Sequence, residues 1–177
     1  MLINQYFTTP ILGFSAYSGT GKTTLLTQLI PILQAEGLRL AIIKHAHHEF
    51  DVDQAGKDSY ELRHAGARQM LISSAKRWAL MTEYTQSDSE LNLRELIKQI
   101  DLQHTDLILV EGFKRESFLK IELHRPSLGL PLMCTNDANI IALASDAKVD
   151  NAPAYLPRLD LNNAAEIVEF IQQFFDL

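Results

Sequence analysis

The stretch AYSGTGKTT, residues 16–24, constrains the fold of this chain more than any other segment. It has the pattern of a phosphate-binding loop: a small residue, four variable residues, then Gly-Lys-Thr. Ala16 stands where the strictest pattern has glycine, a mild departure if Ala16 keeps a negative φ. Such a loop needs a strand before it and a helix after it. The apolar run PILGFSA (10–16) predicts the strand, and leucines at helical spacing from Leu25 onward predict the helix.

Each residue type in this loop has a chemical reason. Gly19 and Gly21 let backbone N–H groups turn inward onto phosphate oxygens. The Lys22 ammonium reaches the β- and γ-phosphates, and the Thr23 hydroxyl can coordinate Mg²⁺. Thr24 is a candidate hydrogen-bond donor to the α-phosphate. A Gly/Ser/Thr-rich surface turn is the alternative interpretation, but the flanking strand and helix favour nucleotide phosphate binding. The motif leaves the reaction itself open.

The rest of the chain alternates predicted strands with predicted helices. We expect buried strands over 39–44, 106–112 and 139–145, and a strand over 119–125 with one face in water. We expect helices over 22–37 with a kink at Pro31, over 58–66 with Asp58 or Ser59 as N-cap, over 91–100, and at the C-terminus. Segments 68–74 and 77–84 predict a hairpin. The pattern indicates an α/β fold of the P-loop NTPase type with three layers, a mainly parallel sheet and an added antiparallel hairpin, as a single domain over residues 1–177.

An acidic partner for the phosphate loop follows the strand DLILVEG (106–112). A P-loop requires a carboxylate at the end of a neighbouring strand to hold Mg²⁺, often through water. Glu111 follows four apolar residues, and Gly112 then permits a tight turn. The alternative is a strand-end charge that simply reaches solvent. Asp106, at the start of the strand, is interpreted as a cap or surface residue. We therefore predict catalytic roles for Lys22 and Glu111.

A polar loop, KHAHHEFDVDQAGKDS (44–59), follows the second predicted strand. In parallel α/β folds the loops at the carboxyl ends of strands carry the site. We interpret this segment as a switch-like loop over the γ-phosphate, with Lys44, His48 or Lys57 contacting anionic oxygens and Asp53 assisting Mg²⁺. A merely solvated loop is the alternative. Zinc binding by the three histidines in residues 45–48 is disfavoured, because no cysteine accompanies them and their spacing matches no strong zinc pattern.

Charge and cysteine content narrow the function classes. A formal net charge of −6 argues against a general nucleic-acid binder, which needs a basic face. The single cysteine, Cys134, excludes an intramolecular disulfide framework and cysteine-rich metal sites. It fits a reducing cytoplasm, where we expect the protein to reside. The N-terminal MLINQYFTTP lacks the pattern of a signal peptide. No run approaches the ~18 apolar residues of a membrane span, so no membrane association is expected.

Taken together, these pieces resemble the molybdopterin-guanine dinucleotide biosynthesis protein B (MobB) family. The matching segments are SGTGKTTLL, IKHAHHEFDVDQAGKDSYELRHAGA, RWALMTE, DLILVEGFK, KIELHR and IALASD, in order from about residue 11 to residue 146. The histidine-containing block is far more specific than the P-loop, because general NTPases do not share it.

The resemblance implies a GTP-binding protein of low GTPase activity that assists the molybdenum cofactor guanylyltransferase in attaching GMP to molybdopterin, and that forms a homodimer. It places phosphate and Mg²⁺ binding on Gly19, Thr20, Gly21, Lys22, Thr23 and Thr24 and a metal-facing role on Glu111. It also makes the 47–57 loop part of the site.

The sequence lacks Asn-Lys-x-Asp, the standard motif that recognises guanine. Asp146, at a predicted strand end, can pair with the guanine N1–H and amino group, and Asp137 is a second candidate. Either is equally interpreted as a helix or turn cap. Trp78 is interpreted as packing or dimer surface rather than a stacking platform. Arg63 is interpreted as a charge on a helix face rather than a ligand of a pterin phosphate.

Three functions fit these observations. The first is a GTP-binding adapter with slow hydrolysis, in which Lys22 and Mg²⁺ stabilise the transferred phosphoryl group. The second is an ATP-dependent small-molecule kinase with Asp53 or Asp51 as base. The third is a non-enzymatic pterin carrier whose nucleotide sets its shape. A kinase consumes ATP only with an acceptor present, whereas the adapter prefers GTP and releases phosphate without one.

Overall fold

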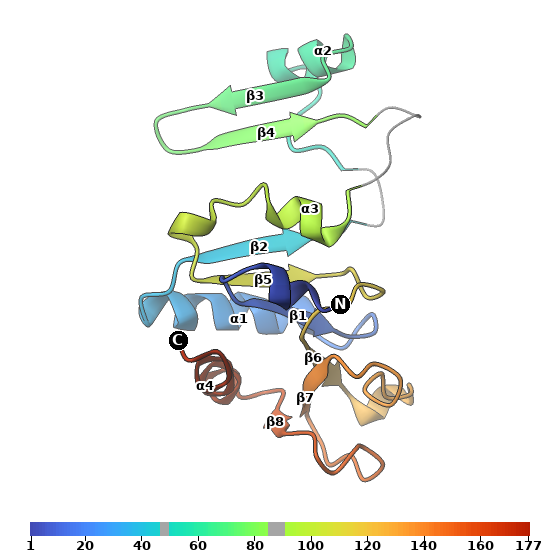
Figure 1. The fold of residues 1–177 in the computed structure, drawn as a ribbon. Helices are drawn as coiled ribbons and strands as arrows, with labels where there is room; N and C mark the ends of the chain where they lie inside the picture. The colour runs from blue at the N-terminus through green and yellow to red at the C-terminus, as the bar shows by residue number, and fades with distance from the viewer. Residues whose placement is uncertain (47–49, 85–90) are drawn as a thin grey trace. The chain divides into compact units, whose positions relative to one another are not determined.

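The computed structural model describes residues 1–46, 50–84 and 91–177, and these form two compact units (Figure 1). The first unit combines Met1–His45 with Leu93–Leu177, and the second is Ala46–Asn92. His48 lies outside the described residues. The single-domain organisation expected for residues 1–177 stays a prediction.

The first unit is built on a six-stranded, entirely parallel sheet in the order β2-β5-β1-β6-β7-β8. Apolar side chains of α1 and α4 pack on one face, and those of α3 and the N-terminal 3-10 helix η1 on the other, so the unit has three layers (Figure 1). This confirms the predicted fold class. The strands are β1 (Ile11–Ser15), β2 (Leu40–Lys44), β5 (Leu107–Glu111), β6 (Lys120–His124), β7 (Ile140–Ser145) and β8 (Arg158–Asp160). The helices are η1 (Ile3–Tyr6), α1 (Lys22–Ala35), α3 (Leu93–Ile97), η2 (Leu102–His104), η3 (Pro126–Leu128) and α4 (Ala164–Phe175).

The helix after the phosphate loop has a well-defined end. Gly37 adopts φ 89°, and its N–H bonds the Gln34 carbonyl while the Leu38 N–H bonds the Leu33 carbonyl. This is the Schellman arrangement, which glycine favours because it lacks a Cβ. Helix α1 continues without interruption through Pro31. Four leucines of α1 are buried against the sheet, as their spacing predicts.

The second unit contains α2 (Asp58–His64) and the antiparallel pair β3 (Gln69–Ser73) and β4 (Trp78–Thr82). The predicted hairpin is therefore confirmed. The Ser74 hydroxyl accepts hydrogen bonds from the N–H groups of Lys76 and Arg77, which stabilises a turn whose sequence is not a preferred one. The N-cap prediction for α2 was wrong: the helix begins at Asp58, so the cap position is Lys57.

Strand β6 is buried on both faces, and the prediction that one of its faces lies in water was wrong. Its polar residues Lys120 and Glu122 each have protein partners. The Lys120 ammonium lies 2.8 Å from the Asp137 carboxylate and donates to the Glu116 carbonyl. The Glu122 carboxylate accepts the backbone N–H groups of residues 133 and 134 at 2.8 and 2.7 Å. The segment that follows β6 supplies the donors to Glu122. The alternation of polar and apolar residues along β6 therefore distinguishes two faces that are both packed, not one packed face and one face in water.

Candidate functional site

The phosphate-binding loop connects β1 to α1, as its pattern requires. Gly19 and Gly21 adopt φ 81° and 99°, a left-handed conformation that other residues rarely take, whereas Ala16 is outside the positive-φ group. The buried Thr20 hydroxyl donates to the Tyr17 carbonyl at 2.9 Å and holds the loop closed on itself. Helix α1 begins at Lys22, so the last three residues of the 16–24 motif form its first turn. Backbone amides and a helix N-terminus are thus combined in the way that anion-binding loops combine them.

Glu111 lies at the end of β5 between two lysines. Its carboxylate is 3.3 Å from the Lys22 ammonium and 3.1 Å from the Lys44 ammonium. The sheet causes this convergence, because Glu111 is in register with Phe14 of β1 on one side and with Lys44 of β2 on the other. Partial burial opposes ionisation of Glu111, but the hydrogen bonds and charges of Lys44 and Lys22 outweigh it and hold its pKa below the usual value. The carboxylate is therefore ionised and placed beside the loop.

The turn after β5 is as tight as the glycine there indicates. Gly112 has φ 98°, and a Cβ at this position would lie 2.6 Å from the Cβ of His45. Phe113 follows with φ 51° and stacks on the His45 ring at a centroid distance of 4.7 Å. The His45 N–H also bonds the Glu111 carbonyl at 2.8 Å. These contacts fix the direction in which Glu111 leaves the sheet.

Arg125, directly after β6, is a site residue that the sequence interpretation missed. Its Nε donates to the Thr20 carbonyl of the phosphate loop at 2.8 Å, and its Nη1 donates to the Asp146 carboxylate at 2.5 Å. Asp146 follows β7, so the ends of two adjacent strands are joined to the loop by one guanidinium. The signal in the sequence was an arginine at the end of a predicted strand, KIELHR, on the edge that carries the other site residues.

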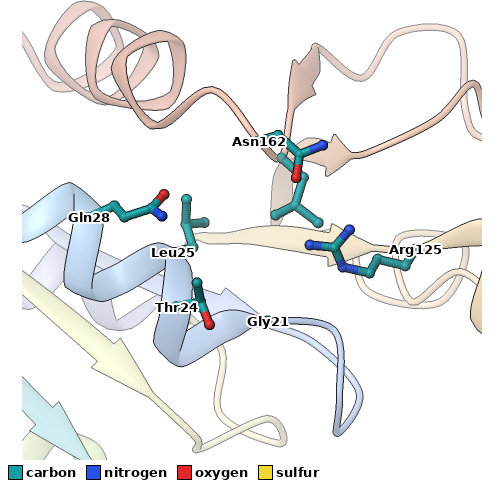
Figure 2. A pocket seen from close by; sticks show the side chains of 7 residues that line it. Gly21, Thr24, Leu25, Gln28, Arg125 and Asn162 are labelled. Atoms are coloured by element: carbon teal, nitrogen blue, oxygen red, sulfur yellow. The ribbon is translucent and has the colours of Figure 1, made fainter.

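A pocket opens beside the phosphate loop, with a volume of about 320 Å³. Figure 2 shows side chains from α1 on one side of it and Arg125 and Asn162 on the other. Two of its lining residues, Gly21 and Thr24, belong to the loop itself. The lining residues are Gly21, Thr24, Leu25, Gln28, Arg125, Leu161 and Asn162.

Asp137, the second guanine candidate, has a set of partners away from the loop. It pairs with Lys120 and accepts the backbone and side-chain N–H groups of Asn139 at 3.0 and 2.9 Å. This is the turn-capping arrangement that the sequence left open for Asp137.

Asp53 belongs to the second unit, where it is bound to Arg63. The two side chains are 2.8 Å apart, and both are largely buried. Arg63 also contacts Asp51 and lies 2.7 Å from Glu83, so it joins three carboxylates. The hydrogen bond from Arg63 holds the pKa of Asp53 below its usual value. The interpretation of Arg63 as a charge on a solvated helix face was therefore wrong, because its carboxylate partners enclose it.

Clustered metal ligands and helices able to span a membrane are both absent from the described part of the chain. In residues 1–46, 50–84 and 91–177, no group of three or more His, Cys, Asp or Glu side chains is arranged to hold a metal ion. Two of the three histidines considered for zinc lie outside those ranges. Within the same ranges, no helix combines the length and the apolar character that crossing a bilayer demands.

Comparison with known proteins shows the same relatives in sequence and in structure. Residues 11–146 match the family model described as molybdopterin guanine dinucleotide synthesis protein B. The chain is 50% identical over 166 residues to the molybdopterin-guanine dinucleotide biosynthesis adapter protein of Escherichia coli K12, covering 93% of this chain and 94% of that protein. It is 42% identical to the Haemophilus influenzae protein of the same name, covering 93% and 89%. The crystal structure of Bacillus subtilis MobB superposes with a TM-score of 0.71 at 23% identity, covering 93% of this chain and 96% of that one.

Proposed function

Since the chain belongs to the MobB family, we propose that it is a GTP-binding adapter with weak GTPase activity that assists the attachment of GMP to molybdopterin. One observation carries the nucleotide part of this proposal: the convergence of the phosphate loop with the Lys22–Glu111 ion pair at one edge of the parallel sheet. A positively charged loop with an ionised carboxylate beside it matches the charge pattern of a nucleotide with its Mg²⁺ ion.

The residues present fit a Mg²⁺–nucleotide complex. The left-handed Gly19 and Gly21 direct backbone N–H groups to a phosphate, and Lys22 supplies the mobile charge. Thr23, exposed at the start of α1, would offer its hydroxyl to Mg²⁺, and Glu111 would hold the ion through its water shell. Bound Mg²⁺ neutralises charge that develops on the phosphoryl oxygens.

Lys22 and Glu111 change roles when a nucleotide enters. The Lys22 ammonium leaves Glu111 and moves to the anionic oxygens, which it stabilises as charge accumulates there. Glu111, released from Lys22, becomes available to the metal and its waters. Lys44, paired with the same carboxylate, is the second cation that can follow the phosphate. Thr20 and Thr24 complete the proposed phosphate contacts. The roles expected for His48, Asp53 and Asp146 stay predictions.

The experiment is isothermal titration calorimetry with GTP and ATP, followed by phosphate release with and without the guanylyltransferase partner. We expect tighter binding of GTP than of ATP and slow phosphate release without an acceptor. Lys22→Ala should weaken GTP binding by at least about tenfold, because it removes charge-assisted hydrogen bonds. Lys98→Ala, at an exposed lysine outside the loop, is the control. Equal affinities for GTP and ATP would refute the guanine assignment, and ATP consumption that requires an acceptor would indicate the kinase.

We further propose a cytoplasmic homodimer that contacts the guanylyltransferase and molybdopterin. One face of the β3–β4 pair supports self-association, because Leu71, Trp78 and Leu80 are exposed on it. The test is molar mass by light scattering for Trp78→Glu, with Tyr155→Glu as control at another exposed aromatic residue (67% and 78% exposed). A monomer only for Trp78→Glu supports this face. A wild-type monomer, or a Trp78→Glu dimer, refutes it.

A further inference from the structure

The pocket beside the phosphate loop has an apolar floor and a polar rim. Leu25 of α1 and Leu161, which follows β8, are 3% and 4% exposed and form the apolar part. The exposed side chains of Thr24, Gln28 and Asn162 stand around them, together with Arg125 (Figure 2). An apolar surface bounded by a few polar groups is the usual construction of a site for a small organic molecule, and about 320 Å³ is at the lower end of the usual size.

The turn that carries Asn162 is held in place from several sides. The Asn162 N–H donates to the Asp160 carboxylate at 2.8 Å, and the Leu161 N–H bonds the Ser145 carbonyl. Glu166 of α4 accepts the Asp160 N–H at 3.2 Å. Because these bonds tie the turn to both β7 and α4, the Asn162 side chain stands on a fixed support. A group supported in this way can recognise a ligand at little entropic cost.

Arg125 presents a donor at the rim of the pocket. Two of its nitrogens are engaged with the Thr20 carbonyl and with Asp146. Nη2 has no acceptor among the residues that the structure describes, and it lies 3.5 Å from where a Cβ of Gly21 would stand. The two bonds orient the guanidinium, so the remaining donor is directed rather than free to swing.

We propose that this pocket binds the nucleoside part of the nucleotide, with the base against Leu25 and Leu161. The inference rests on the proposed function, because the phosphates must occupy the loop. Gly21 and Thr24 belong to both the loop and the pocket, so a nucleotide whose phosphates lie on the loop has its sugar and base directed into the pocket. Asn162 and Gln28 then stand at the polar edges of the base.

The hydrogen-bonding character of Arg125 makes the pocket selective for guanine. A guanidinium offers only donors, so the base edge beside it must carry acceptors. Guanine presents O6 and N7, both acceptors, whereas adenine presents the N6 amino donor in place of O6. Asp146 is already paired with Arg125, so in this assignment Asp146 orients the arginine and Arg125 contacts the base.

The first experiment separates the base from the phosphates. Calorimetry is carried out with GTP and with inorganic tripolyphosphate on the wild type, Gln28→Trp, Gln34→Trp and Lys22→Ala. Gln28→Trp fills the pocket from an exposed position of α1, and Gln34→Trp is the matched control at another exposed position of the same helix. We expect Gln28→Trp to weaken GTP binding by about tenfold or more and to leave tripolyphosphate binding unchanged.

The outcomes distinguish this inference from the proposed function. If Lys22→Ala weakens both ligands while Gln28→Trp binds GTP as the wild type does, the pocket assignment is refuted and the phosphate loop stands. An equal loss of GTP and tripolyphosphate in Gln28→Trp also refutes the pocket. If Lys22→Ala changes neither ligand, the proposed function itself fails.

The second experiment tests selectivity. Arg125→Gln should lower the ratio of GTP to ATP affinity by about tenfold, because a guanidinium that only donates is lost from the base edge. Retained tripolyphosphate binding shows that the loop remains folded in the variant. An unchanged ratio, with both nucleotides weakened alike, would overturn the guanine-reading role of Arg125.

Discussion

Replacing Glu111 with glutamine should have opposite effects on GTP affinity in the absence and in the presence of Mg²⁺. In the free protein Lys22 is paired with Glu111 at 3.3 Å, so a phosphate must break this pair before it can use Lys22. The two side chains are only 19% and 16% exposed, and such a pair is worth about 1 kcal/mol, at the upper end for exposed pairs. The Lys44 side chain is 60% exposed, so its pair with Glu111 adds little.

The expected gain without Mg²⁺ follows from this value. About 1 kcal/mol corresponds to roughly fivefold tighter binding of GTP to Glu111→Gln in EDTA, and loss of the repulsion between carboxylate and phosphate acts in the same direction. With Mg²⁺ present, the variant lacks the carboxylate that would hold the hydrated ion. Outer-sphere partners of metal ions are typically worth tenfold or more, so GTP affinity should fall by about tenfold.

Calorimetry with GTP in EDTA and in excess Mg²⁺ measures both effects. Asp106→Asn is the matched control, because it removes a carboxylate from the opposite end of the same β5 region and should leave both affinities unchanged. If Glu111→Gln binds GTP more weakly in both conditions, Glu111 does not compete for Lys22. If Mg²⁺ makes no difference to the variant relative to the wild type, Glu111 has no metal-facing role.

Three further predictions concern the first unit. The Arg39 guanidinium holds the pKa of Asp106 at about 2, so the pair stabilises the fold above about pH 4 and this contribution is lost as the pH falls through 2. Urea unfolding should therefore show Asp106→Asn less stable than the wild type at pH 7, with the difference in the free energy of unfolding shrinking as the pH falls from about 4 through 2. A difference that stays constant over this range would refute this. Gly13→Ala places a Cβ 2.3 Å from the Phe118 ring and should lower the free energy of unfolding by about 1–3 kcal/mol. Phe118→Leu should restore part of this loss. If it restores none, the contact with Phe118 is not the cause. Burial raises the pKa of the Cys134 thiol to about 11, so iodoacetamide at pH 8 should react slowly with the folded protein and fast in urea; equal rates would contradict it.

The phosphate-binding loop, the helix after it and the strand before Glu111 were predictable because their causes are local. Gly19 and Gly21 adopt the left-handed conformations that their lack of a Cβ permits. Gly37 ends α1 for the same reason, and the apolar run before Glu111 forms the buried strand it predicts. The short β8 went unnoticed, since three residues carry no usable periodicity. The predicted 91–100 helix is shorter than expected, with α3 covering only Leu93–Ile97.

The roles of charged residues depended on partners that the sequence does not reveal. Lys120 and Glu122 alternate with apolar residues, and such a pattern fits a solvated face as well as a covered one. Arg63 likewise carries no sign in the sequence that Asp53 and Glu83 will enclose it. In each case the outcome rests on residues at a distance along the chain.

The sequence by itself determined a strand, a phosphate loop and a helix, together with an acidic residue at a second strand end, since backbone conformation and hydrophobic periodicity act over a few neighbouring residues. Only the tertiary structure decided that Arg125 reaches the Thr20 carbonyl, 105 residues away, and that Leu25 and Leu161 share one pocket. Both depend on the strand order β5-β1-β6-β7-β8, which brings the ends of these strands to one edge. That order results from packing of the whole sheet between its helices, and no single segment encodes it.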